Sequence, residues 1–122
     1  MKRIKLALVG CGRISNNHFN TIEIYKDDIE LKAICDTDKE LLRDHGKKYK
    51  VNSYTNIDSM LDKEDLDLVV LCTPSGIHAK QTILCANHGV NVMTEKPMAT
   101  RWKDGIKMVK ACDESNVRLF VD

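Results

Sequence analysis

The sequence predicts an α/β fold in which a doubly wound parallel sheet lies between helices. Segments with the character of strands alternate with segments of helical periodicity, and the strand segments are nearly continuous apolar runs. Gly and Asp residues punctuate the segment ends at regular intervals. Because 122 residues suffice for one hydrophobic core, we expect a single domain over residues 1–122.

The expected elements follow one another along the chain. Strands are expected at residues 4–9, 31–35, 51–54, 66–72, 90–93 and 117–121. Helices are expected at residues 15–25, 38–46, 58–61, 77–88 and 100–116. Ser15 and Asp38 are candidate N-caps, Gly46 and Gly89 are candidate helix terminators, and Ser75 is a further candidate cap.

The spacing of apolar residues assigns an inner face to three of these helices. The residues expected to face the core are Phe19 and Ile22 in the first helix, with Ile24 as a further candidate, Ala79, Ile83 and Ala86 in the fourth, and Gly105, Met108, Val109 and Cys112 in the last. Trp102 is expected to pack at the start of the last helix, with a contact to another domain or the cofactor as the alternative, and His45 and His88 are expected at the surface.

Composition excludes several function classes. The net charge of +1, with acidic and basic residues interspersed, gives no attraction for nucleic acid or an anionic membrane surface. The apolar runs, such as residues 6–9, are too short to span a bilayer, and no signal peptide is evident, so we expect a cytoplasmic protein. Without C-x-x-C spacing, reduced thiols are expected rather than disulfides or a metal site at Cys11, Cys35, Cys72, Cys85 and Cys112.

The first candidate site residues follow the first two strands, because doubly wound sheets bind ligands at the carboxyl ends of their strands. Gly10 and Gly12 would let a pyrophosphate approach the backbone and the start of the next helix. Ser15 replaces the third glycine of the usual fingerprint, so a plain strand-to-helix turn remains an alternative. Asp36 follows the second expected strand, 21 residues after Ser15. It would accept hydrogen bonds from the adenosine ribose, and its negative charge would favour NAD over NADP. The alternative is that Asp36 is only a turn residue or a helix cap.

A second polar group follows the expected strand at 66–72. Thr73, Pro74 and Ser75 would face the same crevice, because proline ends the strand there. His78, in the first turn of the next helix, would lie near the cofactor. The alternative makes His78 a surface residue.

A charged pair, Glu95 and Lys96, follows the strand at 90–93. Lys96 could donate to a substrate hydroxyl or, if burial or a nearby cation favours its neutral form, help to move the proton of that hydroxyl. Its bond to Pro97 is a candidate cis peptide. A solvated ion pair without function is the alternative for these two residues.

Taken together, four segments resemble the N-terminal domain of the Gfo/Idh/MocA oxidoreductases. The matching segments are residues 9–14 (Val-Gly-Cys-Gly-Arg-Ile), 34–36 (Ile-Cys-Asp), 72–75 with His78 (Cys-Thr-Pro-Ser), and 95–99 (Glu-Lys-Pro-Met-Ala). Glu-Lys-Pro at this place is far more specific than the glycine motif. The resemblance covers essentially the whole chain and implies a Rossmann-like domain that binds NAD.

The resemblance also implies a role for each matching residue. Gly10, Gly12, Arg13 and Ile14 would meet the pyrophosphate, and Asp36 would bind the adenosine ribose. The wall near the nicotinamide would consist of Thr73, Pro74, Ser75, His78 and Glu95. Lys96 would be the catalytic lysine, close to the cofactor and the reacting hydroxyl.

Residues 94–102 and 108–113 resemble a narrower group within the family. These bacterial enzymes oxidise the 3-hydroxyl of UDP-N-acetylglucosaminuronic acid during surface polysaccharide (lipopolysaccharide) biosynthesis. Family members continue into a C-terminal substrate domain, which is absent here, so we expect a truncated protein without substrate turnover of its own. An open sheet edge near Phe120 would favour homo-oligomers.

Two other functions remain open at this stage. A non-catalytic dinucleotide sensor would use the fold without chemistry, although Lys96 favours chemistry in the parent protein. An S-adenosylmethionine methyltransferase also uses a Gly-x-Gly turn, but it has no need of Glu-Lys-Pro and usually carries an acidic residue where Leu8 and Val9 stand.

Overall fold

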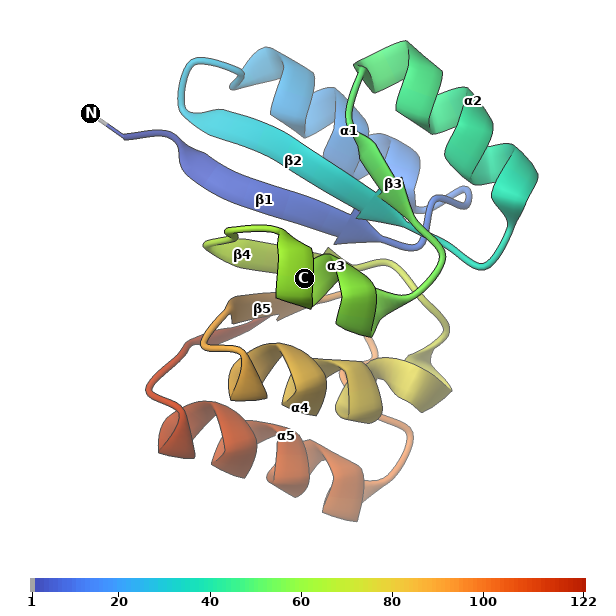
Figure 1. Cartoon of the computed structure of the whole chain (residues 1–122). Coiled ribbons are helices and arrows are strands. Elements are labelled where there is room, and N and C mark those ends of the chain that lie inside the picture. Colours follow the sequence, from blue (N-terminus) through green and yellow to red (C-terminus); the bar gives the residue numbers. More distant parts are fainter. Residues whose placement is uncertain (1) are drawn as a thin grey trace.

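The computed structural model describes residues 2–122 and shows a six-stranded parallel sheet in the order β3-β2-β1-β4-β5-β6 (Figure 1). The predicted α/β fold class is confirmed; the predicted domain, 1–122, includes Met1, which lies outside the described residues. The strands are β1 (Ile4–Val9), β2 (Ile29–Cys35), β3 (Asn52–Tyr54), β4 (Leu68–Leu71), β5 (Asn91–Thr94) and β6 (Leu119–Val121). The helices are α1 (Ser15–Ile24), α2 (Lys39–Tyr49), α3 (Ile57–Lys63), α4 (His78–Asn87) and α5 (Trp102–Glu114), with a short 3₁₀ turn, η1 (Ser75–Ile77), before α4.

Strand β1 lies between the two halves of the sheet. Leu8 of β1 pairs with Ile34 of β2 on one side and with Val70 of β4 on the other. The chain builds β1, β2 and β3 outward in one direction, then returns to place β4, β5 and β6 in the other. This reversal opens a crevice between the carboxyl ends of β1 and β4, where such folds bind ligands.

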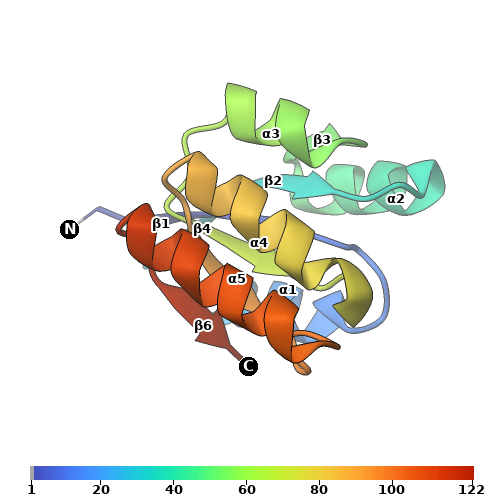
Figure 2. The same cartoon turned by 90° about the horizontal axis from the view of Figure 1, so that it is seen from below.

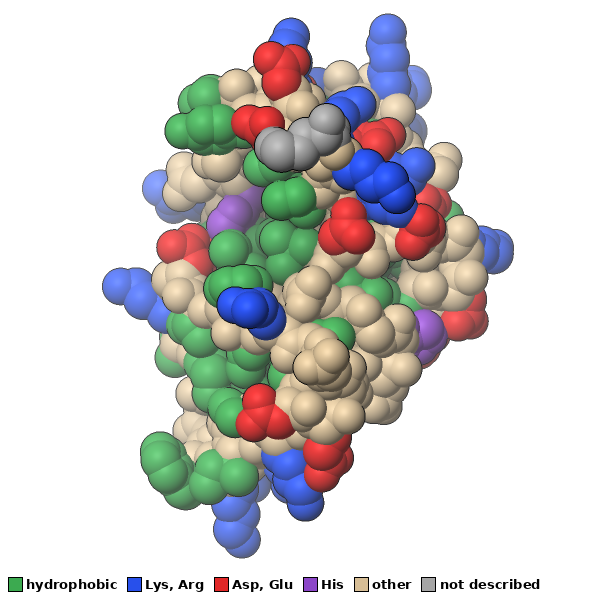
Figure 3. Space-filling model, turned by 90° about the vertical axis from the view of Figure 1, so that its left-hand side faces the viewer, with side chains coloured by type: hydrophobic (Ala, Val, Ile, Leu, Met, Phe, Trp, Pro, Cys, Tyr) green, Lys and Arg blue, Asp and Glu red, His purple; other side chains and the backbone are tan. Residues whose placement is uncertain are grey.

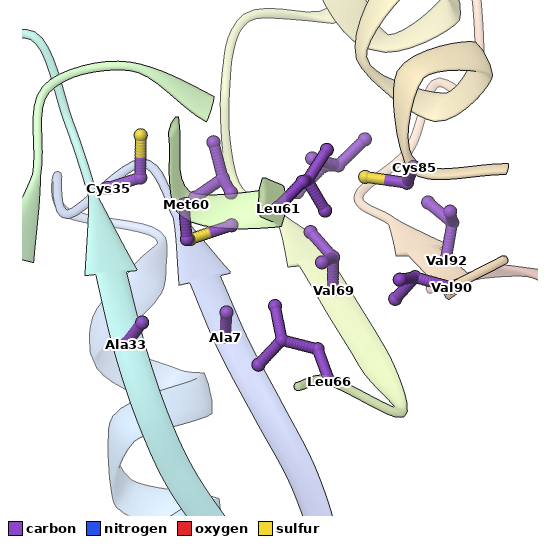
Figure 4. Close-up of a cluster of buried hydrophobic side chains, with 12 residues drawn as sticks. Ala7, Ala33, Cys35, Met60, Leu61, Leu66, Val69, Cys85, Val90 and Val92 are labelled. Atoms are coloured by element: carbon purple, nitrogen blue, oxygen red, sulfur yellow. The ribbon is translucent and has the colours of Figure 1, made fainter. Parts of the chain in front are cut away.

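One half of the core lies between the sheet and helices α3 and α4 (Figure 4). Met60 of α3 is fully buried and packs with the small side chains of Ala7 and Ala33, which lie on neighbouring strands. Cys85 of α4 and Val92 of β5 extend this cluster across the second half of the sheet. Small residues on the central strands therefore let the helices approach the sheet closely.

The other half of the core lies beneath α1 and α2. Phe19 of α1 is fully buried and stacks on Tyr49 of α2, with ring centroids 4.4 Å apart. His45 also stacks on the Phe19 ring, with centroids 5.0 Å apart. His45 is therefore half-buried rather than fully exposed, whereas His88 is exposed as expected. Ile24, the further inner candidate of α1, is 74% exposed and does not face the core.

The predicted helix ends are confirmed in part: Gly89, with a φ of +73°, directly follows the last turn of α4 as expected. Asp38 caps α2 as predicted, since its side chain accepts from the backbone N–H groups of Glu40 and Leu41. Gly46 does not end this helix, which continues to Tyr49 and stops at the left-handed Lys50. Ser15 is not an N-cap either. It lies inside α1, and its hydroxyl donates to the carbonyl of Gly12 at 2.5 Å.

Helices α4 and α5 lie side by side over the second half of the sheet (Figure 2). The buried residues of α4 are His78, Thr82, Cys85 and Ala86. Ala86 is buried as predicted, whereas Ala79 and Ile83 are only partly buried. In α5, Met108 and Cys112 are buried as predicted, whereas Val109 is 46% exposed and Trp102, predicted to pack, is 83% exposed. An apolar face of α5 is thus left uncovered.

Acidic and basic side chains are interspersed on the face where the strands begin, and hydrophobic side chains gather on one side of it (Figure 3). At the edge of the sheet, Phe120 of β6 is 43% exposed. The predicted association through this edge remains a prediction. Within residues 2–122, no helix has the length and apolarity needed to cross a membrane.

The turn after β1 requires a glycine at position 10. Gly10 has a φ of +93°, and a Cβ there would lie 2.6 Å from the carbonyl oxygen of Cys72. Its N–H donates to the carbonyl of Cys35 at 2.7 Å. The backbones that follow β1, β2 and β4 therefore meet at a distance that leaves no room for a side chain.

Replacing Gly10 by alanine should destabilise the chain by about 3 kcal/mol, through backbone strain and the clash with Cys72. Gly12→Ala is the matched control: a Cβ at this position would have no heavy atom within 4 Å, so a change of only about 0.5 kcal/mol is expected. Urea unfolding followed by circular dichroism measures both. Equal losses in the two variants would contradict the role given to Gly10.

Buried thiols should make stability fall at alkaline pH. Burial raises the pKa of Cys11, Cys72 and Cys85 from 9.0 to about 12, and that of Cys35 to about 11. Above pH 9.0 the unfolded chain releases these protons while the folded chain retains them. The free energy of unfolding should therefore be steady below that pH and decline as the pH rises towards 11.

Urea unfolding at successive pH values between 8 and 11 measures this decline. In the control variant Cys85→Ala, which lacks one buried thiol, the slope should be shallower than in the unaltered chain. A flat profile in the unaltered chain over the whole range would contradict the prediction.

Candidate functional site

A cavity of about 520 Å³ lies at the carboxyl ends of β1, β2 and β4. Its walls are formed by the turn after β1 that contains Gly10 and Gly12 (the glycine turn), by Asp36 and by the segment after β4, and one side of α4 closes it. A larger hollow of about 630 Å³ runs along α5 but contains none of the residues predicted to bind a ligand. The topology of the sheet makes the smaller cavity the candidate site.

The two glycines of the glycine turn have different roles. Gly10 permits the close contact of three backbones, whereas Gly12 faces open space in the cavity. Helix α1 starts directly after this turn, so that the positive end of its dipole points towards the same region. Arg13 and Ile14 are exposed beside the turn and outside the cavity lining. A phosphate could therefore approach the backbone at Gly12.

Asp36 is half-buried in the cavity wall, and its two carboxylate oxygens have different partners. One oxygen accepts from the N–H of Cys11 at 2.7 Å, and the other from the N–H of Asp38 at 2.8 Å. The Asp36 side chain therefore stabilises both the glycine turn and the turn after β2 in which Asp36 itself lies. Because a carboxylate offers about four acceptor positions, Asp36 can still accept bonds from two hydroxyls of a ligand.

The segment after β4 lies partly in the cavity and partly behind it. Thr73 and Pro74 line the cavity, and the Thr73 hydroxyl donates to Gln81 at 2.6 Å. Ser75 lies in η1, outside the cavity lining, and makes no capping bond. His78 is only 1% exposed, so the alternative that placed it at the surface is wrong. Its ring nitrogens lie 2.8 Å from the carbonyl of Thr73 and 3.1 Å from that of Pro97.

The turn after β5 contains the remaining predicted residues. Glu95 is largely buried and lies 2.8 Å from the ring nitrogen Nε2 of His18 on α1. Lys96 is exposed, and the bond between Lys96 and Pro97 is cis, as the sequence suggested. Neither Glu95 nor Lys96 lines the cavity. The turn therefore stands beside the cavity, at the same end of the sheet.

Sequence reasoning missed several residues of this region. Asn56 and Asp58 line the cavity after β3, where the strand-end rule could have found them. Lys80 and Gln81 line it from α4, one turn after His78. His18 had no such signal, because its partner Glu95 is 77 residues away.

Cysteine chemistry does not contribute to the site. Cys72 lines the cavity, but burial and the nearby carboxylates of Glu95 and Asp122 raise the pKa of its thiol to about 12. A thiol with this pKa is neutral at physiological pH and a poor nucleophile. Among the residues predicted from the sequence, the polar groups available to a ligand are therefore the backbone at Gly12, the carboxylate of Asp36 and the hydroxyl of Thr73, and the side chains of Asn56, Asp58, Lys80 and Gln81 line the same cavity.

Comparison with known proteins agrees with this geometry. Among solved structures, the WlbA dehydrogenase from Bordetella pertussis, in complex with NADH and UDP-GlcNAcA, is 48% identical with a TM-score of 0.97; the alignment covers 99% of this chain and 37% of that one. The WlbA enzyme from Chromobacterium violaceum, with the same two ligands, is 47% identical with a TM-score of 0.98, over 100% of this chain and 35% of that one.

A curated relative, the D-apiose dehydrogenase of Paraburkholderia graminis, is 37% identical over 99% of this chain and 32% of its own length. The chain therefore spans about a third of the relatives that it matches. A family described as oxidoreductases with an NAD-binding Rossmann fold matches residues 4–122. The chain belongs to this family, the Gfo/Idh/MocA oxidoreductases, and forms its NAD-binding domain.

Proposed function

We propose that this chain is the cofactor-binding part of an NAD-dependent dehydrogenase that oxidises the 3-hydroxyl of UDP-N-acetylglucosaminuronate for surface polysaccharide. The observation that carries this proposal is the arrangement of the glycine turn, Asp36 and the exposed Lys96 at one end of the sheet. Support for the sugar comes from the two WlbA structures with NADH and UDP-GlcNAcA, at 47–48% identity.

The cavity fits the adenosine and pyrophosphate parts of NAD. Gly12 offers its backbone to the pyrophosphate, with Arg13 and Ile14 beside it at the start of α1. Asp36 accepts the ribose hydroxyls with the acceptor positions that its backbone partners leave free. Its negative charge would repel a 2′-phosphate, which favours NAD over NADP.

The opposite wall serves the nicotinamide end of the cofactor, which accepts a hydride when bound. Thr73 and Pro74 form this wall, with Ser75 and Glu95 close by. His78 acts from behind, because its ring contacts the carbonyls of Thr73 and Pro97 and not the cavity. The amine of Lys96, when in its neutral form, then takes up the proton of the reacting hydroxyl.

The two alternative functions, a methyltransferase and a non-catalytic dinucleotide sensor, are not equally supported. The family match leaves the methyltransferase without support. A non-catalytic sensor would bind NAD in the same cavity, but it would not depend on the Lys96 amine. Variants of Asp36 and Lys96 therefore test cofactor binding and chemistry separately.

Saturating NAD⁺ should raise the thermal midpoint of the chain, since a ligand at 100 times its Kd adds about 2.7 kcal/mol. In Asp36→Ala the shift should shrink, and the preference for NAD⁺ over NADP⁺ should weaken. Asp38→Ala is the control: loss of its helix cap costs about 1 kcal/mol, but the shift with NAD⁺ should persist. An unchanged NAD⁺ shift in Asp36→Ala would contradict the ribose assignment.

A chimera tests the chemistry. We expect this chain, placed in the B. pertussis WlbA enzyme in place of the matching 37% of that protein, to form NADH from NAD⁺ and UDP-GlcNAcA. Lys96→Met should lower kcat by about 100-fold or more, because it removes the proton acceptor. Lys103→Met, on the exposed side of α5, should not. The 122-residue chain alone should show no turnover.

A chimera that folds and binds NAD⁺ but turns over equally well with Lys96→Met would contradict the catalytic role. Absence of turnover in the unaltered chimera, despite NAD⁺ binding, would favour the sensor. Robust turnover by the chain alone would contradict the expectation that other parts of the relatives supply the substrate site.

A further inference from the structure

The turn that carries Lys96 is connected to α1 by a pair of side chains. His18 and Glu95 are 16% and 19% exposed, and Nε2 of His18 lies 2.8 Å from a carboxylate oxygen of Glu95. Because a carboxylate only accepts, the His18 nitrogen carries the proton in this bond. Helix α1 starts at the glycine turn, so the pair joins the proposed phosphate site to the lysine turn.

A second histidine holds the other end of the same turn. His78 lies between the carbonyls of Pro97 and Thr73, at 3.1 and 2.8 Å. Both partners are acceptors, so a neutral ring donates to one of them and an imidazolium to both. Lys96 thus stands between two residues, Glu95 and Pro97, that each have a histidine partner.

The backbone of the turn is also tied to the sheet. The N–H of Glu95 donates to the carbonyl of Leu71 on β4, and that of Lys96 to the carbonyl of Asp122. Of these connections, only the His18–Glu95 bond determines where the carboxylate next to Lys96 points. A carboxylate released from His18 would be free to pair with the neighbouring ammonium.

We infer that His18 is a positioning residue that acts through Glu95, keeping this carboxylate away from Lys96 so that the lysine amine stays available. The inference rests on the proposed function for the use of that amine in proton transfer. It goes beyond that function because it assigns a role to a residue outside the glycine and Glu-Lys-Pro motifs. It also makes the lysine turn and the start of α1 one preorganised unit before the cofactor binds.

The same cluster has a third member, Asp122, whose carboxylate lies 3.8 Å from Nε2 of His18. The ligand atoms of His18, Glu95 and Asp122 lie within 4.8 Å of one another, a spacing that a metal ion could use. However, Asp122 is 59% exposed, and the ring nitrogen already has Glu95 at hydrogen-bond distance. We therefore assign the cluster to positioning and make metal binding an outcome of the test.

The experiment measures how fast an acylating reagent modifies Lys96 in the 122-residue chain, by peptide mass spectrometry, with Lys103 as an internal reference. His18→Leu should slow the modification of Lys96 about two- to fivefold, the range of an exposed ion pair. His18→Gln, whose amide still donates, should restore the rate. The matched control is His88→Leu, because His88 pairs with Asp62 away from this turn.

A background of Glu95→Gln separates positioning from a general loss of structure. With no carboxylate to release, His18→Leu should have no further effect on Lys96 there. His18→Ala replaces the leucine variant if that does not fold. Each variant is compared at a temperature at which circular dichroism shows it to be folded.

Three results would overturn the inference: an unchanged Lys96 rate in a folded His18→Leu chain, an equal slowdown in the Glu95→Gln background, or stoichiometric Zn²⁺ binding that His18→Leu abolishes. Failure of the unaltered chain to bind NAD⁺ would instead count against the proposed function. The Lys96 rates do not require cofactor and would still decide the role of His18.

Discussion

The close contact of three backbones at Gly10 is the constraint on which the site depends. A residue with a φ of +93° and no side chain lets the turn after β1 touch the carbonyl of Cys72 and donate to that of Cys35. The carboxylate of Asp36 accepts a hydrogen bond from the N–H of the next residue, Cys11. The loops after β1, β2 and β4 are fixed relative to one another by these short contacts, and the cavity forms between them.

This constraint explains why the sequence predicts part of the site well. Gly10 and Asp36 are determined by local backbone geometry and by their places directly after strands. Each can therefore be recognised from the few residues around it. The cap at Asp38 is local in the same sense. Gly46 is misleading because the end of α2 depends on Tyr49, whose ring must reach Phe19 on another helix. Such a contact leaves no trace in the neighbouring sequence.

The histidines show more clearly which residues could not be predicted from the sequence. The apolar pattern of α4 predicts that Ala79 and Ile83 face the core, but His78 and Thr82 are the buried residues. The buried His78 ring lies at hydrogen-bond distance from two carbonyls, one of them in the distant turn at Pro97. Likewise, His18 carries no motif of its own, and its partner is known only once α1 and β5 are placed in space. Apolar periodicity alone therefore does not identify a buried polar residue whose partner lies in a distant segment.

These contacts also indicate which part of the proposed chemistry this domain provides. It fixes the direction of the lysine turn through the largely buried His18–Glu95 pair, and on the proposed function it places the cofactor through Gly12 and Asp36. Lys96 itself remains exposed, and proton transfer from a sugar hydroxyl is most effective where water is excluded. Water exclusion over Lys96 must therefore come from the substrate and from whatever covers this end of the sheet. On the proposed function, this domain sets the geometry of the reaction, and the choice of sugar is made by groups that approach Lys96 from outside it.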